Sequence, residues 1–250
     1  MRRKIIYAEV TINDKHEPTI APFTPDKKPG KGPKVALIAN THRAAIRVAE
    51  LPTRGRWLTQ GARWQLVQAN FPIGPLLNED THIFDGSIFK NNAQRRSFFM
   101  VAIPKAIAEP IAEMALKQWG SAHRLTRLDT IEHVLFNHYT RNGKILLDDS
   151  DKSSQWIIFP QDSGFRVLFI DDGLPHSAHY ISNEPDMRES ELTWVWEIAK
   201  PKHVIILSRM PEDEVASDKA WEGSWLHGFI SGLGEVEVVD ENLHCLSQLK

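Results

Sequence analysis

Two apolar segments joined by a short polar loop constrain the fold of this chain more than any other feature. Residues 155–159 and 165–170 are apolar at nearly every position, and the loop between them, residues 160–164, reads Pro-Gln-Asp-Ser-Gly. A strand that is apolar on both faces needs cover on both faces, so we expect the two segments to lie in the middle of a sheet. A second turn, residues 171–173, leads into residues 174–181. The pattern predicts an antiparallel meander of three strands.

Strand-like and helix-like segments alternate along the rest of the chain. Leu58, Ala62 and Leu66, for example, recur at helical spacing and predict a helix over about 54–70, with Thr53 as its cap. Single helices between strand-rich stretches predict an α/β or α+β fold with a mixed sheet. The further predicted strands are residues 4–12, 19–23, 35–39, 44–51, 81–84, 97–103, 123–127, 145–147, 203–207 and 235–239. The other predicted helices are residues 105–119, 129–139, 187–198 and 211–233.

Charge and composition narrow the function classes. The formal net charge is −2, which does not favour a nucleic-acid partner or an anionic membrane surface. Cys245 is the single cysteine, so no internal disulfide can form, and a cytoplasmic location is expected. The apolar run near the N-terminus stops at Glu9, too early for a signal peptide, and no run of about 18 apolar residues occurs. We expect any membrane anchor to lie outside this chain.

Several segments, taken in order, resemble the cytoplasmic domains of the type II secretion L protein and the type IV pilus M protein. The apolar strand 35–39 is followed by a turn, a second strand ending in Leu51-Pro52, and a helix. The acidic link at 76–84 and the apolar strand 99–103, with a helix after it, continue the likeness. Residues 156–181 resemble the second phosphate-binding hairpin of actin-like proteins. The resemblance covers about residues 35–239.

The resemblance implies an actin-like, ribonuclease H-like fold, an α/β (α+β) arrangement of two mixed-sheet halves. Residues 1–142 would form the first half and residues 143–250 the second. A small inserted αβ module would occupy about residues 35–120 of the first half.

Three loops that hold nucleotide in actin-like ATPases differ in this chain. The first corresponds to residues 7–13, which contain no glycine, although glycines let backbone amides approach phosphate. In the second, Phe159 and Pro160 occupy the place of an acidic residue that would organise Mg²⁺, a cation that binds carboxylate or phosphate oxygens. In the third, residues 208–211 replace a Gly-Gly pair. We therefore expect no cofactor and no catalytic residue.

By resemblance, the expected function is that of a non-catalytic scaffold in the inner-membrane assembly platform of a type II secretion or type IV pilus system. The expected partners are the tail of an inner-membrane assembly protein and the secretion or pilus assembly ATPase, and a homodimer is a further option. Trp57, Trp64 and Phe71 of the module are the predicted partner-binding residues, since aromatic side chains are enriched at interface hot spots. Core packing is the alternative role for these aromatic residues.

One alternative function is a nucleotide-binding actin-like ATPase of pilus assembly, with ATP and Mg²⁺ as cofactors. In that case Asp162, Ser163 and Gly164 would contact phosphate, and Glu9 would lie near the metal.

A second alternative is a small-molecule enzyme with a site made of His176, His179 and Asp171. Two histidines and a carboxylate can ligate a metal. However, side chains at i and i+3 of a strand point to opposite faces, so we predict no metal site. Ser163 lacks the strand-to-helix turn of a nucleophile elbow. The glycines at 228–234 follow a helix rather than open one, which argues against a dinucleotide loop.

Overall fold

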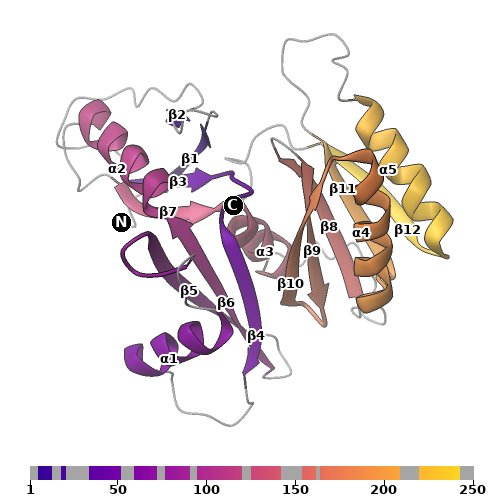
Figure 1. The fold of residues 1–250 in the computed structure, drawn as a ribbon, viewed down its shortest axis with the longest axis horizontal. Helices are drawn as coiled ribbons and strands as arrows, with labels where there is room; N and C mark the ends of the chain where they lie inside the picture. The colour runs from indigo at the N-terminus through magenta and orange to yellow at the C-terminus, as the bar shows by residue number, and fades with distance from the viewer. Residues whose placement is uncertain are drawn as a thin grey trace.

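The computed structural model describes residues 5–12, 18–20, 34–51, 59–71, 77–90, 95–119, 125–141, 154–161, 164–208 and 220–242. The strands are β1 (Ile5–Ile12), β2 (Pro18–Ile20), β3 (Lys34–Ala39), β4 (Ala45–Leu51), β5 (His82–Lys90), β6 (Arg96–Pro104), β7 (Leu125–Thr130), β8 (Ser154–Gln161), β9 (Gly164–Asp171), β10 (Leu174–Ser182), β11 (His203–Ser208) and β12 (Glu237–Asn242). The helices are α1 (Gln60–Asn70), α2 (Lys105–Trp119), α3 (Ile131–Arg141), α4 (Pro185–Ile198) and α5 (Ala220–Leu233). Figure 1 shows how the sheets and helices are arranged.

The predicted meander lies in a five-stranded sheet whose order is β10-β9-β8-β11-β12. β8, β9 and β10 are antiparallel neighbours, and β11 runs parallel to both β8 and β12. Gln155 lies opposite Ile170, and Ile158 lies opposite Val167, so the two apolar segments pair along their length. The meander predicted from the apolar pattern is therefore confirmed.

Side chains of β8 alternate between two hydrophobic cores, as the period of a strand requires. Trp156 and Ile158 pack in one core with residues of α4 and α5. Ile157 and Phe159 pack in the other core, which includes residues of α3. Figure 1 shows α4 and α5 on one side of this sheet and α3 on the other. The prediction of cover on both faces is confirmed.

The first half is built on a four-stranded sheet in the order β2-β1-β3-β7. β1 runs parallel to β3 and β3 parallel to β7, whereas β2 is antiparallel to β1. Leu37 and Ile38 of β3 are fully buried. Ile107 and Ile111 of α2 belong to the same core as these two residues.

A smaller antiparallel sheet, in the order β4-β6-β5, packs with α1 and forms a separate module between β3 and α2. Its core contains Leu51, Val67, Phe71, Phe98 and Met100. In the observed topology β3 pairs with β1 and β7, so residues 35–39 belong to the first sheet rather than to the module. The division of the chain at residue 142 remains a prediction.

Two predicted boundaries in the module are wrong. Helix α1 begins at Gln60 with Thr59 as its cap, not at residue 54 with Thr53, and the Ala62 amide donates to Thr59 Oγ1 at 3.2 Å. Strand β5 continues well past Phe84, where the sequence predicted its end. Gly86 explains that miss, because it looks like a turn residue. In the sheet, a Cβ at Gly86 would lie 2.6 Å from the Phe98 ring, so glycine is required there by packing.

Helix α3 joins the two halves. It packs against β3 and β7 of the first half and against β9 and β10 of the second. Leu135 and Phe136 of α3 are fully buried and share one core with Leu37 of β3 and Leu168 of β9. The predicted strand at 145–147 lies outside the described residues.

Candidate functional site

The end of β8 meets the first half of the protein, and the candidate site is built around this meeting point. Asp162 and Ser163 at the tip lie outside the described residues. Gly164 is paired with Gln161 across the hairpin and with Ser182 of β10. A Cβ at Gly164 would lie 2.1 Å from the Ile181 carbonyl oxygen, so a close approach of two strands accounts for this glycine.

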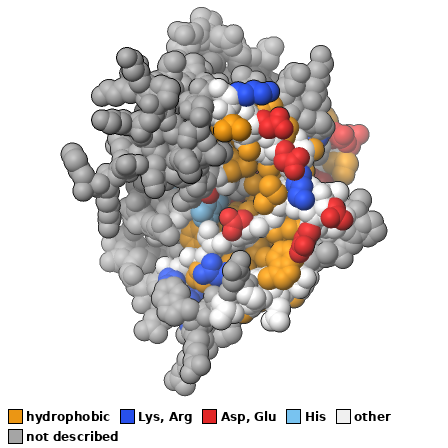
Figure 2. All heavy atoms as spheres, turned by 90° about the vertical axis from the view of Figure 1, so that its left-hand side faces the viewer, with side chains coloured by type: hydrophobic (Ala, Val, Ile, Leu, Met, Phe, Trp, Pro, Cys, Tyr) orange, Lys and Arg blue, Asp and Glu red, His pale blue; other side chains and the backbone are white. Residues whose placement is uncertain are grey.

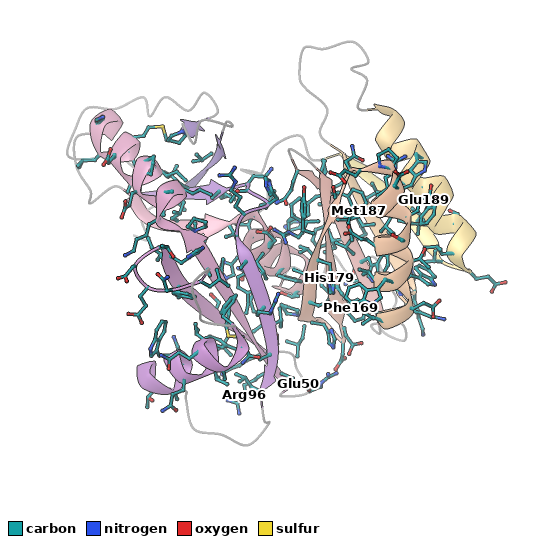
Figure 3. The ribbon with its side chains drawn as sticks, in the orientation of Figure 1. Glu50, Arg96, Phe169, His179, Met187 and Glu189 are labelled. Carbon is teal, nitrogen blue, oxygen red and sulfur yellow. The ribbon has the colours of Figure 1, made fainter. Side chains whose placement is uncertain are left out.

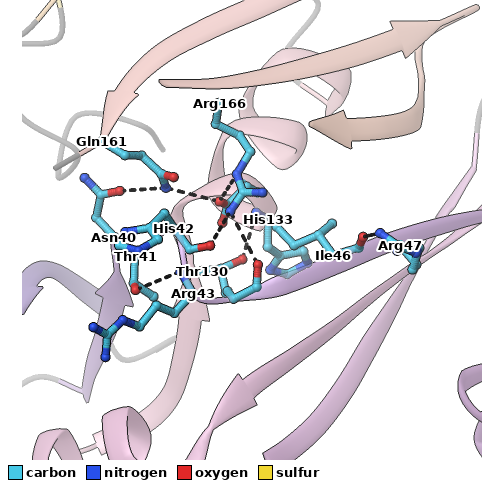
Figure 4. A network of polar contacts seen from close by, with 12 residues as sticks. Asn40, Thr41, His42, Arg43, Ile46, Arg47, Thr130, His133, Gln161 and Arg166 are labelled. Carbon is cyan, nitrogen blue, oxygen red and sulfur yellow. Dashed lines mark hydrogen bonds and ion pairs between the residues drawn. The ribbon is translucent and has the colours of Figure 1, made fainter. Parts of the chain in front are cut away.

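Gln161, the last residue of β8, is bonded to the first half. Its Nε2 donates to Asn40 Oδ1 at 3.1 Å and to Glu132 Oε1 at 3.4 Å (Figure 4). Asn40 directly follows β3, and Glu132 lies in the first turn of α3. Three elements that are distant in sequence therefore converge on one buried amide.

Arg166 of β9 forms a buried ion pair with Glu132. The distance from Arg166 Nε to Glu132 Oε1 is 3.1 Å, and the two side chains are 5% and 0% exposed. Arg166 Nη2 also donates to the carbonyl oxygens of His42 and Ala44, each at 3.4 Å (Figure 4). The guanidinium thus bonds to the helix that joins the halves and to the turn that leads into the module.

Burial is the largest influence on the pKa of Glu132. Removal from water raises the pKa of the Glu132 carboxyl, because the charged form loses its hydration, and the nearby Arg166 charge opposes that rise. The position of Glu132 in the first turn of α3 also favours a negative charge there. We call Asn40, Glu132, Gln161 and Arg166 the inter-half network.

Aromatic contacts cover the network on its module side. The rings of His42 and Tyr180 stack with centroids 5.3 Å apart, and the Arg166 guanidinium lies 5.5 Å from the Tyr180 ring centroid. Tyr180 belongs to β10, so the last strand of the meander also contacts the turn before β4.

The other two predicted nucleotide loops are described only in part. Residues 7–12 lie in β1, where residues 7–10 pair with β3 and residues 10–12 pair with β2. The side chain of Glu9 lies outside what the structure describes. Ser208 ends β11, and residues 209–211 lie outside the described residues. Contacts of Glu9, Asp162 and Ser163 with phosphate or metal remain predictions.

The histidine site predicted for a small-molecule enzyme is not assembled. Asp171 lies 3.6 Å from Arg95 in an ion pair, while His179 bonds to Ser177 at 3.1 Å. His176 packs edge-on against Phe169 with centroids 5.1 Å apart. Within the described segments, no group of three His, Cys, Asp or Glu side chains is placed to hold a metal ion.

The aromatic residues predicted to bind partners mostly pack within the module. Phe71 is 2% exposed, and its ring lies 5.8 Å from that of Phe84, so its assignment to a partner surface is corrected to the module core. Trp64 is half-buried, with its ring 5.6 Å from that of Phe84. Contact of Trp64 with a partner remains a prediction, and Trp57 lies outside the described residues.

Two hollows flank the inter-half network. One, of about 140 Å³, lies between the module and the first half, where Ile83 and Gly86 of β5 face Ala108 of α2 and His133 of α3. His133 is held in place by Asp129, with 3.1 Å between Nδ1 and Oδ1. The other hollow, of about 380 Å³, lies between β4, β10 and α4.

The sequence did not point to the inter-half network. One local signal was present, because Arg166 is the one charged residue in the apolar strand 165–170. A charged residue among buried neighbours needs a partner, but the chain offers many acidic residues, and nothing local selects Glu132.

No protein-family model and no curated protein sequence matches this chain. Solved structures do resemble it. A Bacteroides thetaiotaomicron protein described as having an actin-like ATPase fold and unknown function is 11% identical, with 98% of this chain and 95% of that chain covered and a TM-score of 0.54. The PilM–PilN type IV pilus biogenesis complex is 10% identical, with 97% and 89% covered and a TM-score of 0.58. The cytoplasmic domain of EpsL, an inner-membrane component of the type II secretion system of Vibrio cholerae, is 11% identical, with 98% and 92% covered and a TM-score of 0.44.

The first two of these similarities establish the fold. The chain has the actin-like α/β fold that its sequence predicted, and the predicted resemblance is confirmed at that level. None of the helices within the described residues is long and apolar enough to cross a membrane.

Proposed function

We propose that this protein is a non-catalytic scaffold of the actin-like fold in the inner-membrane assembly platform of a type IV pilus or type II secretion system. It binds the cytoplasmic tail of an inner-membrane assembly protein and the assembly ATPase, and it works on the cytoplasmic side of that membrane. The similarity to the PilM–PilN type IV pilus biogenesis complex supports a protein partner in pilus assembly.

The observation that carries the proposal is the inter-half network. A bound Mg²⁺–nucleotide needs free oxygen ligands for the metal and free donors for the phosphates. Here Glu132 is fully buried, and its carboxylate is paired with Arg166, a residue that is itself only 4% exposed. A cation bound at Glu132 would meet the guanidinium charge, and a phosphate there would meet the carboxylate. This pairing supports a network that holds the two halves together rather than one that binds a Mg²⁺–nucleotide.

The β5 side of the module offers a surface for a partner tail. β5 is an edge of the module sheet, and among the described strands it pairs with β6 alone. Ile83 on β5 is 45% exposed and lines the 140 Å³ hollow. An extended peptide can add to such an edge through its backbone and place side chains in the hollow beside it.

Charge on this face fits a basic tail. Asp85 of β5 and Glu109 and Glu113 of α2 are exposed, as are Lys90 of β5 and Lys117 of α2. Figure 2 views this side, where α1, α2 and β5 lie in Figure 1, and shows hydrophobic side chains gathered with acidic and basic side chains among them. Cytoplasmic segments of membrane proteins carry an excess of lysine and arginine. The exposed carboxylates on this side would pair with such residues.

The proposal is tested by binding measurements with the two proposed partners. The probes are the cytoplasmic tail of the inner-membrane protein encoded beside this chain and the N-terminal domain of the assembly ATPase. We expect Ile83→Asp to weaken tail binding at least about tenfold, because a charge would be buried under the tail. Ile198→Asp on α4, where Ile198 is 54% exposed, is the matched control and is expected to bind the tail normally. Failure of both probes to bind the wild-type protein would overturn the proposal.

An actin-like ATPase is the competing function, favoured by the fold of the Bacteroides thetaiotaomicron protein. It predicts heat on titration with ATP and Mg²⁺, and loss of that heat on Asp162→Ala or Ser163→Ala. The scaffold predicts no heat at millimolar nucleotide. Sedimentation of the purified protein tests the further expectation of a homodimer.

A further inference from the structure

The larger of the two hollows has the size and the lining of a small-molecule site. Its volume is about 380 Å³, and residues of β4, β9, β10 and α4 line it. Ligand pockets in proteins measure about 300–1,000 Å³ and combine apolar and aromatic walls with a few polar groups. We call this space the β4–β10 hollow. Figure 3 shows His179 on β10, the strand that lies beside β4.

Small and aromatic side chains give the β4–β10 hollow an apolar part. Ala44 and Ala178 line it together with the rings of Tyr180 and Trp194. Trp194 is 58% exposed, and its ring stands edge-on to the His179 ring with centroids 5.8 Å apart. An aromatic ring exposed at a hollow can pack against the apolar part of a ligand.

Arg47 of β4 brings a positive charge to the hollow. Its side chain is exposed, and its Nη1 donates to the carbonyl oxygen of Ile46 at 2.9 Å (Figure 4). Within the described part of the chain, no carboxylate forms an ion pair with Arg47. Its charge and its other donors are therefore available to a ligand.

Arg166 of β9 adds a second guanidinium to the lining. Its Nε pairs with Glu132, and its Nη2 donates to the carbonyl oxygens of His42 and Ala44. These contacts fix the guanidinium in place, and among the described residues none bonds to Nη1. Two guanidinium groups at one hollow favour an anion, because their planar donors match the paired oxygens of a carboxylate.

The charges that act on His179 give the sign of the electric field in the hollow. Burial lowers the pKa of His179 most, and the charges of Arg47, Arg166 and His176 lower it further. Each of these three groups is a cation when protonated. The imidazole is therefore largely neutral at neutral pH, and a negative charge beside it would be stabilised by the two arginines.

Glu191 of α4 limits how much negative charge the hollow accepts. Its side chain also lines the hollow, and its Oε2 accepts a hydrogen bond from the Ser182 amide at 3.2 Å. Glu132 already balances the charge of Arg166. These two carboxylates disfavour a dianion such as a phosphate, whereas a single negative charge can pair with Arg47.

We propose that the β4–β10 hollow binds a small molecule with one carboxylate and an apolar or aromatic body. Arg47 and the Nη1 of Arg166 bind the carboxylate, and Trp194 packs against the body. Such a ligand contacts the module and the second half at once. This hollow shares no lining residue with the hollow beside β5, so the proposal does not depend on the proposed function.

Four probes with similar bodies and different charged groups test the ligand class: phenylpropanoate, phenylpropanamide, phenylpropylamine and phenylethyl phosphate. In calorimetric titrations of the full chain, we expect phenylpropanoate to bind at least about tenfold more tightly than the amide or the amine. The phosphate is expected to bind no more tightly than the carboxylate. Bound phenylpropanoate is also expected to raise the pKa of His179 in an NMR titration, because a nearby anion favours the charged imidazolium.

Variants place the ligand in the hollow. Arg47→Met is expected to weaken phenylpropanoate binding at least about tenfold, whereas Arg43→Met, at an exposed arginine that does not line the hollow, leaves it unchanged. Glu191→Gln is expected to strengthen binding of phenylethyl phosphate, because it removes an opposing charge. Equal binding of phenylpropanoate and its amide, tighter binding of the phosphate to the wild type, or unchanged affinity in Arg47→Met would overturn the proposal. Failure of every probe to bind at millimolar concentration would overturn it as well.

Discussion

Replacing Arg166 by methionine tests whether the inter-half ion pair is as tightly buried as the structure has it. Arg166 and Glu132 are 5% and 0% exposed, with 3.1 Å between their charged atoms. Removing one partner of a buried ion pair leaves the other charge without compensation in a medium of low dielectric. The cost is about 3–5 kcal/mol. We expect Arg166→Met to lower the free energy of unfolding by about 4 kcal/mol at neutral pH, a large part of the 5–15 kcal/mol typical of a whole domain.

The stability lost in Arg166→Met should depend on pH, and the titration of Glu132 sets the direction of that dependence. Burial raises the pKa of this carboxyl above its ordinary value, so the folded protein binds its proton more tightly than the unfolded chain does. The Glu132 contribution to stability is therefore complete below the ordinary carboxyl pKa and is lost as pH rises through the raised pKa. Without Arg166 the pKa rises further, and the cost of Arg166→Met is expected to be smaller at about pH 5 than at neutral pH.

Equilibrium unfolding in urea, followed by tryptophan fluorescence at both pH values, measures these differences. Arg47→Met on β4 is the matched control, since Arg47 is exposed, and its effect is expected to stay within about 0.5 kcal/mol. The double variant Glu132→Met with Arg166→Met is expected to be more stable than Arg166→Met alone, because it leaves no unpaired charge. If Arg166→Met costs no more than Arg47→Met at neutral pH, the two charges are not buried together and the reasoning is refuted.

Three further predictions follow from single contacts. Gly164→Ala is expected to destabilise the protein, since its Cβ would lie 2.1 Å from a carbonyl oxygen. A Cβ at Gly61 would have nothing within 4 Å, so Gly61→Ala should stabilise α1 by about 0.5–1 kcal/mol. Thermal unfolding of the two variants tests whether stability falls in the first and rises in the second. Phe71→Ala is expected to cost about 3–5 kcal/mol in the same measurement, and a cost under 1 kcal/mol would place the ring at the surface. Burial, and then the charge of Arg47, lower the pKa of His179, so the free energy of unfolding should fall as pH drops below about 6.5. NMR titration of His179 in Arg47→Met should give a higher pKa than in the wild type, because the Arg47 charge is gone.

The sequence predicted the parts of the fold that depend on local patterns. The meander from β8 to β10 was found because residues 165–170 are apolar at nearly every position, which only a strand with cover on both faces tolerates. Helix α4 was placed to within two residues at its start, where Pro185 occupies the first turn. Local patterns failed where packing decides, as in β5, which continues past the predicted end at Phe84 and holds Gly86 inside the sheet.

The candidate site was the part that no local pattern could reveal. Gln161 and Asn40 are 121 residues apart in sequence, and Gln161 and Glu132 are 29 apart. Each is an ordinary polar residue at the end of a strand or in the first turn of a helix, where polar residues are common. Only the topology, which brings the end of β3, the start of α3 and the hairpin tip together, turns these residues into a network.

The contacts of the inter-half network are directional, and this property bears on function. Apolar contacts tolerate sliding, whereas each hydrogen bond and ion pair fixes a distance and an angle. Arg166 contacts both α3 and the turn before the module from the second half. These contacts favour one mutual orientation of the module and the two halves over others. A scaffold that binds one partner at β5 and another elsewhere needs such a fixed geometry, while an enzyme that admits nucleotide between its halves needs the opposite, a cleft that opens. The buried network therefore supports the proposed scaffold on mechanical grounds.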